Sequence, residues 1–218
     1  MQNFRLQIYP LVRRVLLCAT LLTFPLIAMA TEEPKFVVLE KSEAFELRQY
    51  HAMVLAEVEV EGDLDESSSK GFRLIADYIF GNNTAKSGSS EKIAMTTPVT
   101  VVPKSEKIAM TAPVTVEQGA DKWRMHFVMP SQYTLQTLPT PNNPRVSLRE
   151  VPPKKVAVVT FSGWVSEEKN ASKTAELLAW MASKKLKPIG TPELARYNPP
   201  WTLPFFRRNE VMVEYGSE

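Results

Sequence analysis

Two histidines are the side chains in this sequence best suited to hold a metal ion, His51 and His126. His51 lies where two predicted strands meet in a turn, and His126 shares a strand face with Arg124, opposite the apolar side chains. Both positions favour a solvated side chain over a metal ligand. The one cysteine, Cys18, lies in an N-terminal segment that we expect to be removed, so a zinc site built from cysteine and histidine cannot be assembled. We predict no metal site.

Motifs that support enzymatic chemistry are missing from the sequence. It contains no G-x-S-x-G elbow for acyl transfer, no G-x-x-x-x-G-K-[ST] loop for phosphates and no G-x-G-x-x-G after a strand. Acidic pairs such as Glu57 with Glu59, or Glu167 with Glu168, lie where a solvated strand or helix face needs charge. We therefore predict no catalytic residues and expect that the protein is not an enzyme.

The first thirty residues have the pattern of an export signal. Three arginines precede an apolar run from Val15 to Ala28, and the small-residue site Ala28-Met29-Ala30 follows. We predict cleavage that leaves a mature chain beginning near Thr31, and a periplasmic or secreted location. A lipoprotein is the alternative, since Cys18 lies in the apolar run, but Leu17 stands where lipidation signals prefer a small residue.

The charge of the chain changes when this segment is removed. The full sequence has 26 Lys+Arg and 24 Asp+Glu. Without the three arginines of the signal, 23 basic residues face 24 acidic ones, a net charge of −1. This balance argues against a nucleic-acid partner and against an anionic membrane surface, and no later apolar stretch is long enough to span a membrane. The remaining 188 residues suit one domain over residues 31–218.

Alternating apolar residues predict two strands over residues 44–50 and 52–60, joined at His51. A helix is expected next, with cap candidates at residues 65–69 and a stop signal at Gly81-Asn82-Asn83.

A twelve-residue repeat follows this helix. The segment Ser90–Val101 is rewritten as Ser105–Val116 with a single change, Thr97 to Ala112. Both copies alternate, which favours an extended β-hairpin turned at Pro103-Lys104, although a dedicated site built from the duplicated strands is the alternative. Proline lacks the N–H that a sheet needs, so the proline inside each copy predicts an edge or a bulge.

The pattern of elements restarts after a Pro- and Asn-rich linker at residues 139–144. Before the linker, residues 123–129 read as a strand. After it, the sequence predicts paired strands, a helix and two final strands, at residues 146–151, 155–165, 167–185, 194–197 and 210–215. We therefore predict an α+β fold of two pseudo-symmetric β-β-α-β-β halves, about 36–130 and 145–215, that form a distorted antiparallel barrel flanked by two helices.

Several strings in the sequence coincide with a known family. They are Phe45-Glu-Leu-Arg-Gln-Tyr50, Tyr78-Ile-Phe-Gly-Asn-Asn83, Lys107-Ile-Ala-Met-Thr-Ala-Pro-Val114, Phe127-Val-Met-Pro130, Tyr197-Asn-Pro-Pro-Trp-Thr-Leu-Pro204 and Arg207-Arg-Asn-Glu-Val211. In this order they resemble the signature segments of the SOUL haem-binding family, over nearly all of residues 36–215. The resemblance implies reversible binding of haem or another tetrapyrrole in an apolar cleft beside the first helix. Some members have a histidine where this chain has Gln49, so axial ligation by the displaced His51, or by His126, is only a possibility.

The first helix has an apolar surface wide enough for such a cleft. Its apolar side chains cover about two thirds of the circumference, more than one sheet face can bury. Loops that cover the helix are the alternative explanation. Flat apolar walls and nearby cations suit a porphyrin and its propionates. The predicted haem-binding residues are Lys70, Phe72, Arg73, Ile75, Ala76 and Ile79 on the helix and Trp123 on the strand at residues 123–129.

The function expected from these observations is a binding protein of the cell envelope that carries, buffers or scavenges b-type haem, held without covalent bonds, or a related tetrapyrrole. Two alternatives come from other classes: an enzyme that acts on a small hydrophobic molecule, and a scaffold whose apolar surface meets a protein partner of unknown identity.

Overall fold

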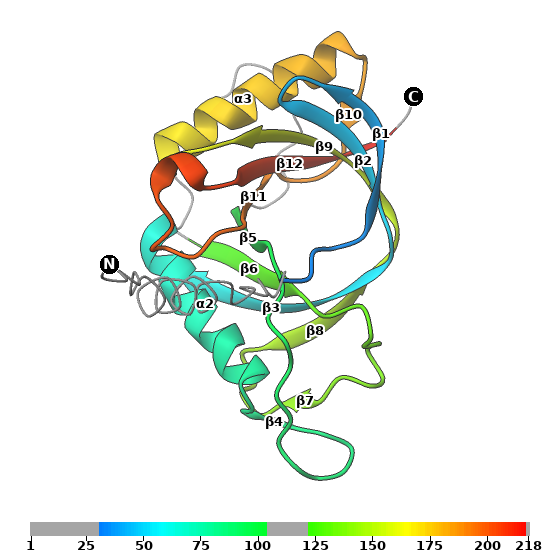
Figure 1. Cartoon of the computed structure of the whole chain (residues 1–218), viewed down its shortest axis with the longest axis vertical. Coiled ribbons are helices and arrows are strands. Elements are labelled where there is room, and N and C mark those ends of the chain that lie inside the picture. The colour runs from blue at the N-terminus through cyan, green and yellow to red at the C-terminus, as the bar shows by residue number, and fades with distance from the viewer. Residues whose placement is uncertain (1–30, 104–121, 217–218) are drawn as a thin grey trace, which may run out of the picture. The chain divides into compact units, whose positions relative to one another are not determined.

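Most strands of the protein join into one antiparallel sheet, in a computed structural model that describes residues 31–103 and 122–216 (Figure 1). The strands of this sheet are β1 (Phe36–Ser42), β2 (Phe45–Tyr50), β3 (Met53–Glu61), β5 (Val99–Pro103), β6 (Lys122–Val128), β8 (Ser147–Val151), β9 (Lys154–Phe161), β10 (Lys187–Pro188), β11 (Glu193–Arg196) and β12 (Asn209–Gly216). Two short strands, β4 (Asn83–Thr84) and β7 (Thr140–Pro141), pair separately. The predicted α+β class, with a large antiparallel sheet, is confirmed.

The strand order in the sheet is β1-β2-β9-β12-β11-β5-β6-β3-β8, with β10 added beside β12. Strands β1 and β8 stand at its two ends, so the described pairing is that of an open sheet and no closed barrel is found. Strands from before residue 130 pair with strands from after residue 145, since β2 lies beside β9 and β3 beside β8. The division into two pseudo-symmetric halves stays a prediction.

The hairpin predicted at His51 is wrong. Strands β2 and β3 flank His51 and Ala52 but do not pair with each other. Figure 1 shows the chain continuing from β2 into β3 around the curve of the sheet. The His51 N–H donates to the Lys35 carbonyl (3.1 Å), so this backbone bends by bonding to the segment before β1 instead of reversing direction.

Helix α2 (Leu64–Ile79) begins earlier than the cap candidates at residues 65–69 indicated. Asp63 is the N-cap, and its carboxylate accepts a hydrogen bond from the Glu66 N–H at 2.8 Å. The helix lies against β3 and β6. Gly71 permits this close packing, because a Cβ at that position would lie 2.9 Å from the Met125 sulfur.

Helix α3 (Glu167–Ser183) confirms the second predicted helix and ends two residues before the predicted Lys185. Ser166 caps it by accepting a hydrogen bond from the Lys169 N–H (3.1 Å). The helix packs on β9, β10 and β12, on the same outer side of the sheet as α2 (Figure 1). Within the described residues, neither helix has the length and apolarity needed to cross a membrane.

Both faces of the sheet bury apolar side chains. The face that carries the helices contributes, among others, Val58, Met125, Phe127, Val159 and Val211 to one core with helix residues such as Ile75 and Leu177. The opposite face, called the inner face here, buries Tyr50, Leu55, Val128, Val151, Val156, Val158, Ala195, Tyr197 and Met212. Curvature of the sheet brings strands together over this second face, and the unbroken apolar run Val156–Val159 in β9 reflects that two-sided burial.

The repeated segment is described only for its first copy. Residues 91–95 of that copy are not a strand, and β5 begins at Val99, directly after Pro98, in agreement with proline standing outside a ladder. The second copy, and with it the predicted hairpin turn, lies outside the described residues. The strands predicted at residues 194–197 and 210–215 are confirmed as β11 and β12.

Candidate functional site

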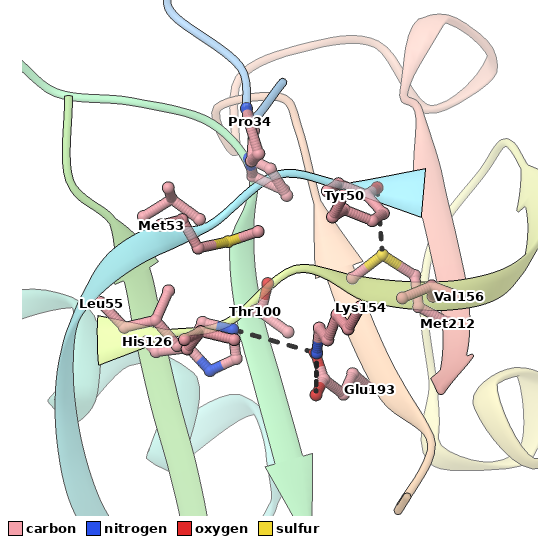
Figure 2. A pocket seen from close by; sticks show the side chains of 13 residues that line it. Pro34, Tyr50, Met53, Leu55, Thr100, His126, Lys154, Val156, Glu193 and Met212 are labelled. Carbon is pink, nitrogen blue, oxygen red and sulfur yellow. Dashed lines mark hydrogen bonds and ion pairs between the residues drawn. The ribbon is translucent and has the colours of Figure 1, made fainter. Parts of the chain in front are cut away.

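A pocket on the inner face of the sheet lies where β3, β5, β6, β9, β11 and β12 converge (Figure 2). It encloses about 430 Å³ of empty space, part of it open to solvent. We call it the inner pocket. Its lining residues are Pro34, Tyr50, Met53, Leu55, Pro98, Thr100, His126, Val128, Val151, Lys154, Val156, Glu193 and Met212. The lining is mostly apolar, with four titratable side chains, Tyr50, His126, Lys154 and Glu193, placed among hydrophobic ones.

His126 is the least satisfied polar group of this pocket. Only 7% of the residue is exposed, and Nδ1 has no hydrogen-bond partner among the described residues. Its Nε2 lies 3.9 Å from a Glu193 carboxylate oxygen, which is too long for a direct hydrogen bond. Burial lowers the pKa of His126, although the Glu193 charge partly opposes this effect. The expectation of a solvated His126 is therefore wrong, because the sheet curves over the face that carries it.

Lys154 and Glu193 complete the polar side of the inner pocket. The Lys154 ammonium lies 3.4 Å from the second Glu193 oxygen, and both side chains are about one fifth exposed (21%). Figure 2 shows the Lys154 and Glu193 side chains meeting beside the His126 ring. The pair carries no net charge, and a neutral His126 adds none.

A second polar group on the inner face is built around Arg48 and Glu210. The guanidinium of Arg48 donates to both Glu210 oxygens (2.8 and 3.0 Å), and Glu210 is fully buried. Tyr197 donates its hydroxyl to one of these oxygens (2.6 Å) and Arg208 donates to the other (3.0 Å). Arg48 also donates to the Tyr50 hydroxyl at 3.1 Å. We call these five residues the Arg48–Glu210 cluster.

The electrostatics of this cluster favour its charged form. Burial alone would raise the pKa of Glu210, but the hydrogen bonds and charge of Arg48, with help from Tyr197 and Arg208, hold that pKa below its usual range. Burial likewise opposes the charged form of Arg48, yet the Glu210 carboxylate raises the Arg48 pKa. Since every member has its partners, the cluster is a structural element of the sheet. Its two central residues, Arg48 and Glu210, are 162 residues apart in the sequence.

The residues predicted to bind haem on the first helix divide into two groups. Ile75 and Ile79 are wholly buried against the sheet, and Ala76 is 7% exposed. Phe72 is 39% exposed, and its ring lies 5.5 Å from that of Phe127. Lys70 and Arg73 are exposed at the helix edge, where Lys70 pairs with Glu66 at 2.7 Å. We call the six predicted helix residues the α2 wall.

Trp123, the remaining predicted cleft residue, is half-buried on the helix side of β6. Its indole N–H donates to the Gly62 carbonyl (2.9 Å), just before α2 begins. The structure thus brings Trp123 to the same side of the sheet as the α2 wall. His51, the other possible axial ligand, is exposed as predicted. Whether haem contacts any of these residues stays a prediction.

Sequence reasoning did not identify the inner pocket. Tyr50, Met53, Lys154, Glu193 and Met212 were not singled out as site residues. One signal was present in β3, whose first half, Met53–Ala56, is apolar at every position, whereas its second half alternates with glutamates. An unbroken apolar start followed by alternation indicates that the inner face is covered at one end of the strand and open at the other.

Within the residues that the structure describes, no group of three or more histidine, cysteine, aspartate or glutamate side chains has the spacing of a metal site.

The fold resembles that of several solved structures. The crystal structure of the EcmrR C-terminal domain is 12% identical, with a TM-score of 0.56 over 80% of this chain and 98% of that one. An uncharacterized conserved protein from Listeria innocua is 13% identical, with a TM-score of 0.52 over 86% and 94% of the two chains. A hydrolase from the same organism is 12% identical, with a TM-score of 0.50 over 87% and 94%. At these identities the likeness concerns the fold alone.

Sequence comparisons give a sharper result. A search against curated proteins finds no match to this chain. The family model described as SOUL heme-binding protein, in contrast, matches residues 31–214, which is nearly the whole described region. The predicted resemblance is therefore confirmed, and the chain belongs to the SOUL heme-binding protein family.

Proposed function

We propose that this protein binds haem or a related tetrapyrrole reversibly. The observation that carries the proposal is the match to the SOUL heme-binding family over residues 31–214. Residues 31–218 contain no cysteine, so the sequence offers no thiol for covalent haem attachment and the expected form is b-type. The reaction is binding and release, with no catalytic step.

The α2 wall is the proposed surface for the porphyrin. Positions 72, 76 and 80 are spaced by four residues and therefore lie along one stripe of the helix. Phe72 (39% exposed) and Phe80 (58% exposed) flank the small Ala76 on this stripe. Ile75 and Ile79 support the helix from the sheet side. A planar ligand laid on the stripe would gain most of its binding free energy from burying apolar area.

The propionates of the ligand are proposed to meet Lys70 and Arg73. Both side chains are exposed at the edge of the stripe, and a charge-assisted hydrogen bond to a carboxylate requires no buried unpaired charge there. Lys70 would exchange its ion pair with Glu66 for the ligand, which limits its net contribution.

Iron ligation by a protein side chain is not needed for this mode of binding. His51 is exposed, and position 49, where some family members have a histidine, is a glutamine in this chain. His126 faces the inner pocket on the other side of the sheet from α2. We expect modest affinity, and expect that His51→Ala and His126→Ala each keep most of the binding.

The experiment is a hemin titration of the purified protein, followed by the Soret absorbance. Ala76→Trp should block binding, because the larger side chain would stand on the stripe where the porphyrin is proposed to lie. Ala179→Trp, at an exposed position of α3, is the matched control and should bind like the parent. Circular dichroism checks that both variants remain folded. Unchanged binding in a folded Ala76→Trp protein would remove the α2 wall from the proposal, whereas failure of the parent to bind hemin would overturn the function itself.

Charge reversal separates the propionate contacts from the apolar ones. Changing both Lys70 and Arg73 to Glu should weaken hemin binding by roughly 1 to 3 kcal/mol, the scale of charge-assisted hydrogen bonds, and more strongly at low salt. The control changes Lys169 and Lys185 of the α3 region to Glu. It alters the net charge by the same amount, far along the sequence from α2, and should have little effect on hemin binding.

A role in the cell envelope completes the proposal. Export is supported by the pattern of residues 1–30, and a carrier, buffer or scavenger of haem there needs neither a nucleic-acid partner nor a membrane span. N-terminal sequencing of protein from the envelope fraction should begin near Thr31. An intact N-terminus on cytosolic protein would contradict this location.

A protein-interaction scaffold is the second candidate function, favoured by one cluster of exposed apolar side chains. Trp201 is 83% exposed, and Trp164, Phe205 and Phe206 are each about two thirds exposed (68%, 66% and 69%). These side chains come from two segments, one with Trp164 and one with Trp201, Phe205 and Phe206. The segments are bonded to each other, since the Gly163 N–H donates to the Pro204 carbonyl (2.9 Å). If hemin does not bind, affinity capture compared between the parent and Trp201→Ala/Phe205→Ala tests this candidate.

A further inference from the structure

The inner pocket combines an apolar lining with a small polar patch. The pocket is partly open to solvent, so its empty space of about 430 Å³ includes solvent at its mouth. Two of its side chains, Met53 and Met212, are flexible thioethers that can change rotamer around a ligand. Figure 2 places them over the pocket, with Leu55 and Val156 beside them. Such walls favour a mostly apolar molecule of modest size.

Hydrogen-bonding capacity in the pocket is left unused. Polar groups as buried as His126 normally have a partner, and an unsatisfied one costs about 1–3 kcal/mol. In the part of the chain that the structure describes, His126 Nδ1 has no partner, and 3.9 Å separates Nε2 from the Glu193 carboxylate. Lys154 has further N–H donors beyond the one directed at Glu193. One inserted hydroxyl oxygen could accept from Lys154 while its proton is donated to Glu193 or His126.

The charges in the pocket select against an ionic ligand. Lys154 and Glu193 already balance each other, so a cation would have to displace Lys154 and an anion would meet Glu193. The neighbouring pair Arg149 and Glu57 (3.0 Å) also cancels. The Tyr50 hydroxyl already accepts a hydrogen bond from Arg48 and does not offer a charge to an ionic ligand.

We propose that the inner pocket is a binding site for a small, neutral, mostly apolar molecule with one hydroxyl head group, an alcohol or a phenol. This site is separate from the haem surface, since the pocket opens on the inner face and α2 lies on the other face. The apolar body lies among Met53, Leu55 and Met212, and the hydroxyl inserts between His126, Lys154 and Glu193.

Methionine methyl groups provide the test, because the chain has them on both faces of the sheet. Met53 and Met212 line the pocket, whereas Met125 and Met181 are buried in the core on the helix side. In protein labelled with ¹³C at methionine methyls, p-cresol should shift the Met53 and Met212 signals and leave Met125 and Met181 in place. Toluene, the same molecule without the hydroxyl, should bind about fivefold more weakly, as expected for one net hydrogen bond.

His126→Leu tests the head-group contact. It should reduce the preference for p-cresol over toluene, since Lys154 and Glu193 then hold the hydroxyl alone, while Ala179→Trp keeps the parent's preference. Circular dichroism shows whether the variant is folded, and the labelled parent alone suffices if it is not. The proposal is overturned if p-cresol leaves the Met53 and Met212 signals unchanged, if toluene binds as tightly to the parent, or if folded His126→Leu keeps the parent's full preference.

Hemin distinguishes the two sites in the same spectra. Bound at the α2 wall, paramagnetic hemin should broaden Met125, which lies under Gly71 of the helix, before Met53 and Met212. Hemin that broadens Met53 and Met212 first, or that competes with p-cresol, would mean that the pocket is the haem site and would contradict the separate site. Absence of hemin binding would overturn the proposed function and leave the p-cresol result standing.

Discussion

The two polar groups on the inner face of the sheet are both buried, yet they differ in how completely they are satisfied. In the Arg48–Glu210 cluster, a bidentate ion pair is completed by hydrogen bonds from Tyr197 and Arg208. In the inner pocket, His126 Nδ1 has no hydrogen-bond partner among the described residues, and Nε2 lies 3.9 Å from the Glu193 carboxylate. The comparison teaches that burial alone does not mark a functional residue. A saturated group belongs to the fold, and an unsaturated one is available to a ligand.

Breaking the Arg48–Glu210 cluster should have the largest effect on the free energy of unfolding. Glu210→Gln leaves Arg48 buried beside a neutral amide, and removing one partner of a buried ion pair typically costs about 3 to 5 kcal/mol. The loss is measured by urea unfolding followed by circular dichroism. Glu176→Gln, which breaks the exposed pair with Lys173 (2.7 Å), is the control and should cost less than about 1 kcal/mol. Similar small losses for both variants would contradict the structural role of the cluster.

On acidification, His126 should lower the free energy of unfolding at a higher pH than Glu210 does. The folded protein lowers the pKa of His126 below 6.5, so the unfolded chain takes up the proton first. The free energy of unfolding should therefore fall as the pH drops below about 6.5, by at most about 1.4 kcal/mol per pH unit for one proton. Glu210, whose pKa is also lowered, adds its own loss only below about pH 4.5.

The variant His126→Leu serves as the control for this titration and should flatten the curve between pH 6.5 and 5. Urea midpoints measured at half-unit steps of pH are sufficient. An unchanged slope in the variant would assign the loss to another group.

The smallest expected effect is that of His126→Leu at neutral pH. The substitution removes a ring nitrogen, Nδ1, that has no partner within the described residues and puts an apolar side chain of similar size in place of the ring, so the free energy of unfolding should not fall by more than about 1 kcal/mol. The comparison with Glu210→Gln is then direct, since both positions are buried on the same face. A loss as large as that of Glu210→Gln would show that His126 has a structural partner after all.

Much of the fold could be predicted from local patterns. Both helices, the strand at residues 123–129 and the last two strands follow from the periodicity of their apolar residues. The pairing of strands could not be predicted, because alternation identifies a strand but does not say which strand lies beside it. The assumption that neighbours in sequence pair as a hairpin failed at His51, where β2 and β3 join different partners.

The candidate site was harder to predict than the elements. The family resemblance and the wide apolar surface of the first helix indicated the α2 wall, and its role in binding stays a prediction. The inner pocket depends on curvature, which brings His126, Lys154 and Glu193 together from three strands. Curvature is a property of the whole sheet, so a reading of single strands placed His126 in solvent.

The exchange of strands across the sheet also has a consequence for the speed of folding. Residues such as Tyr50 and Lys154 are direct partners in β2 and β9, although about one hundred positions separate them along the chain. Proteins dominated by such distant pairings have a high contact order and fold in milliseconds to seconds, since the entropy of closing long loops is lost before the contacts form. Neither end of this chain can complete its part of the sheet alone. The N-terminal strands must wait, with their edges unpaired, until the C-terminal ones have been synthesised.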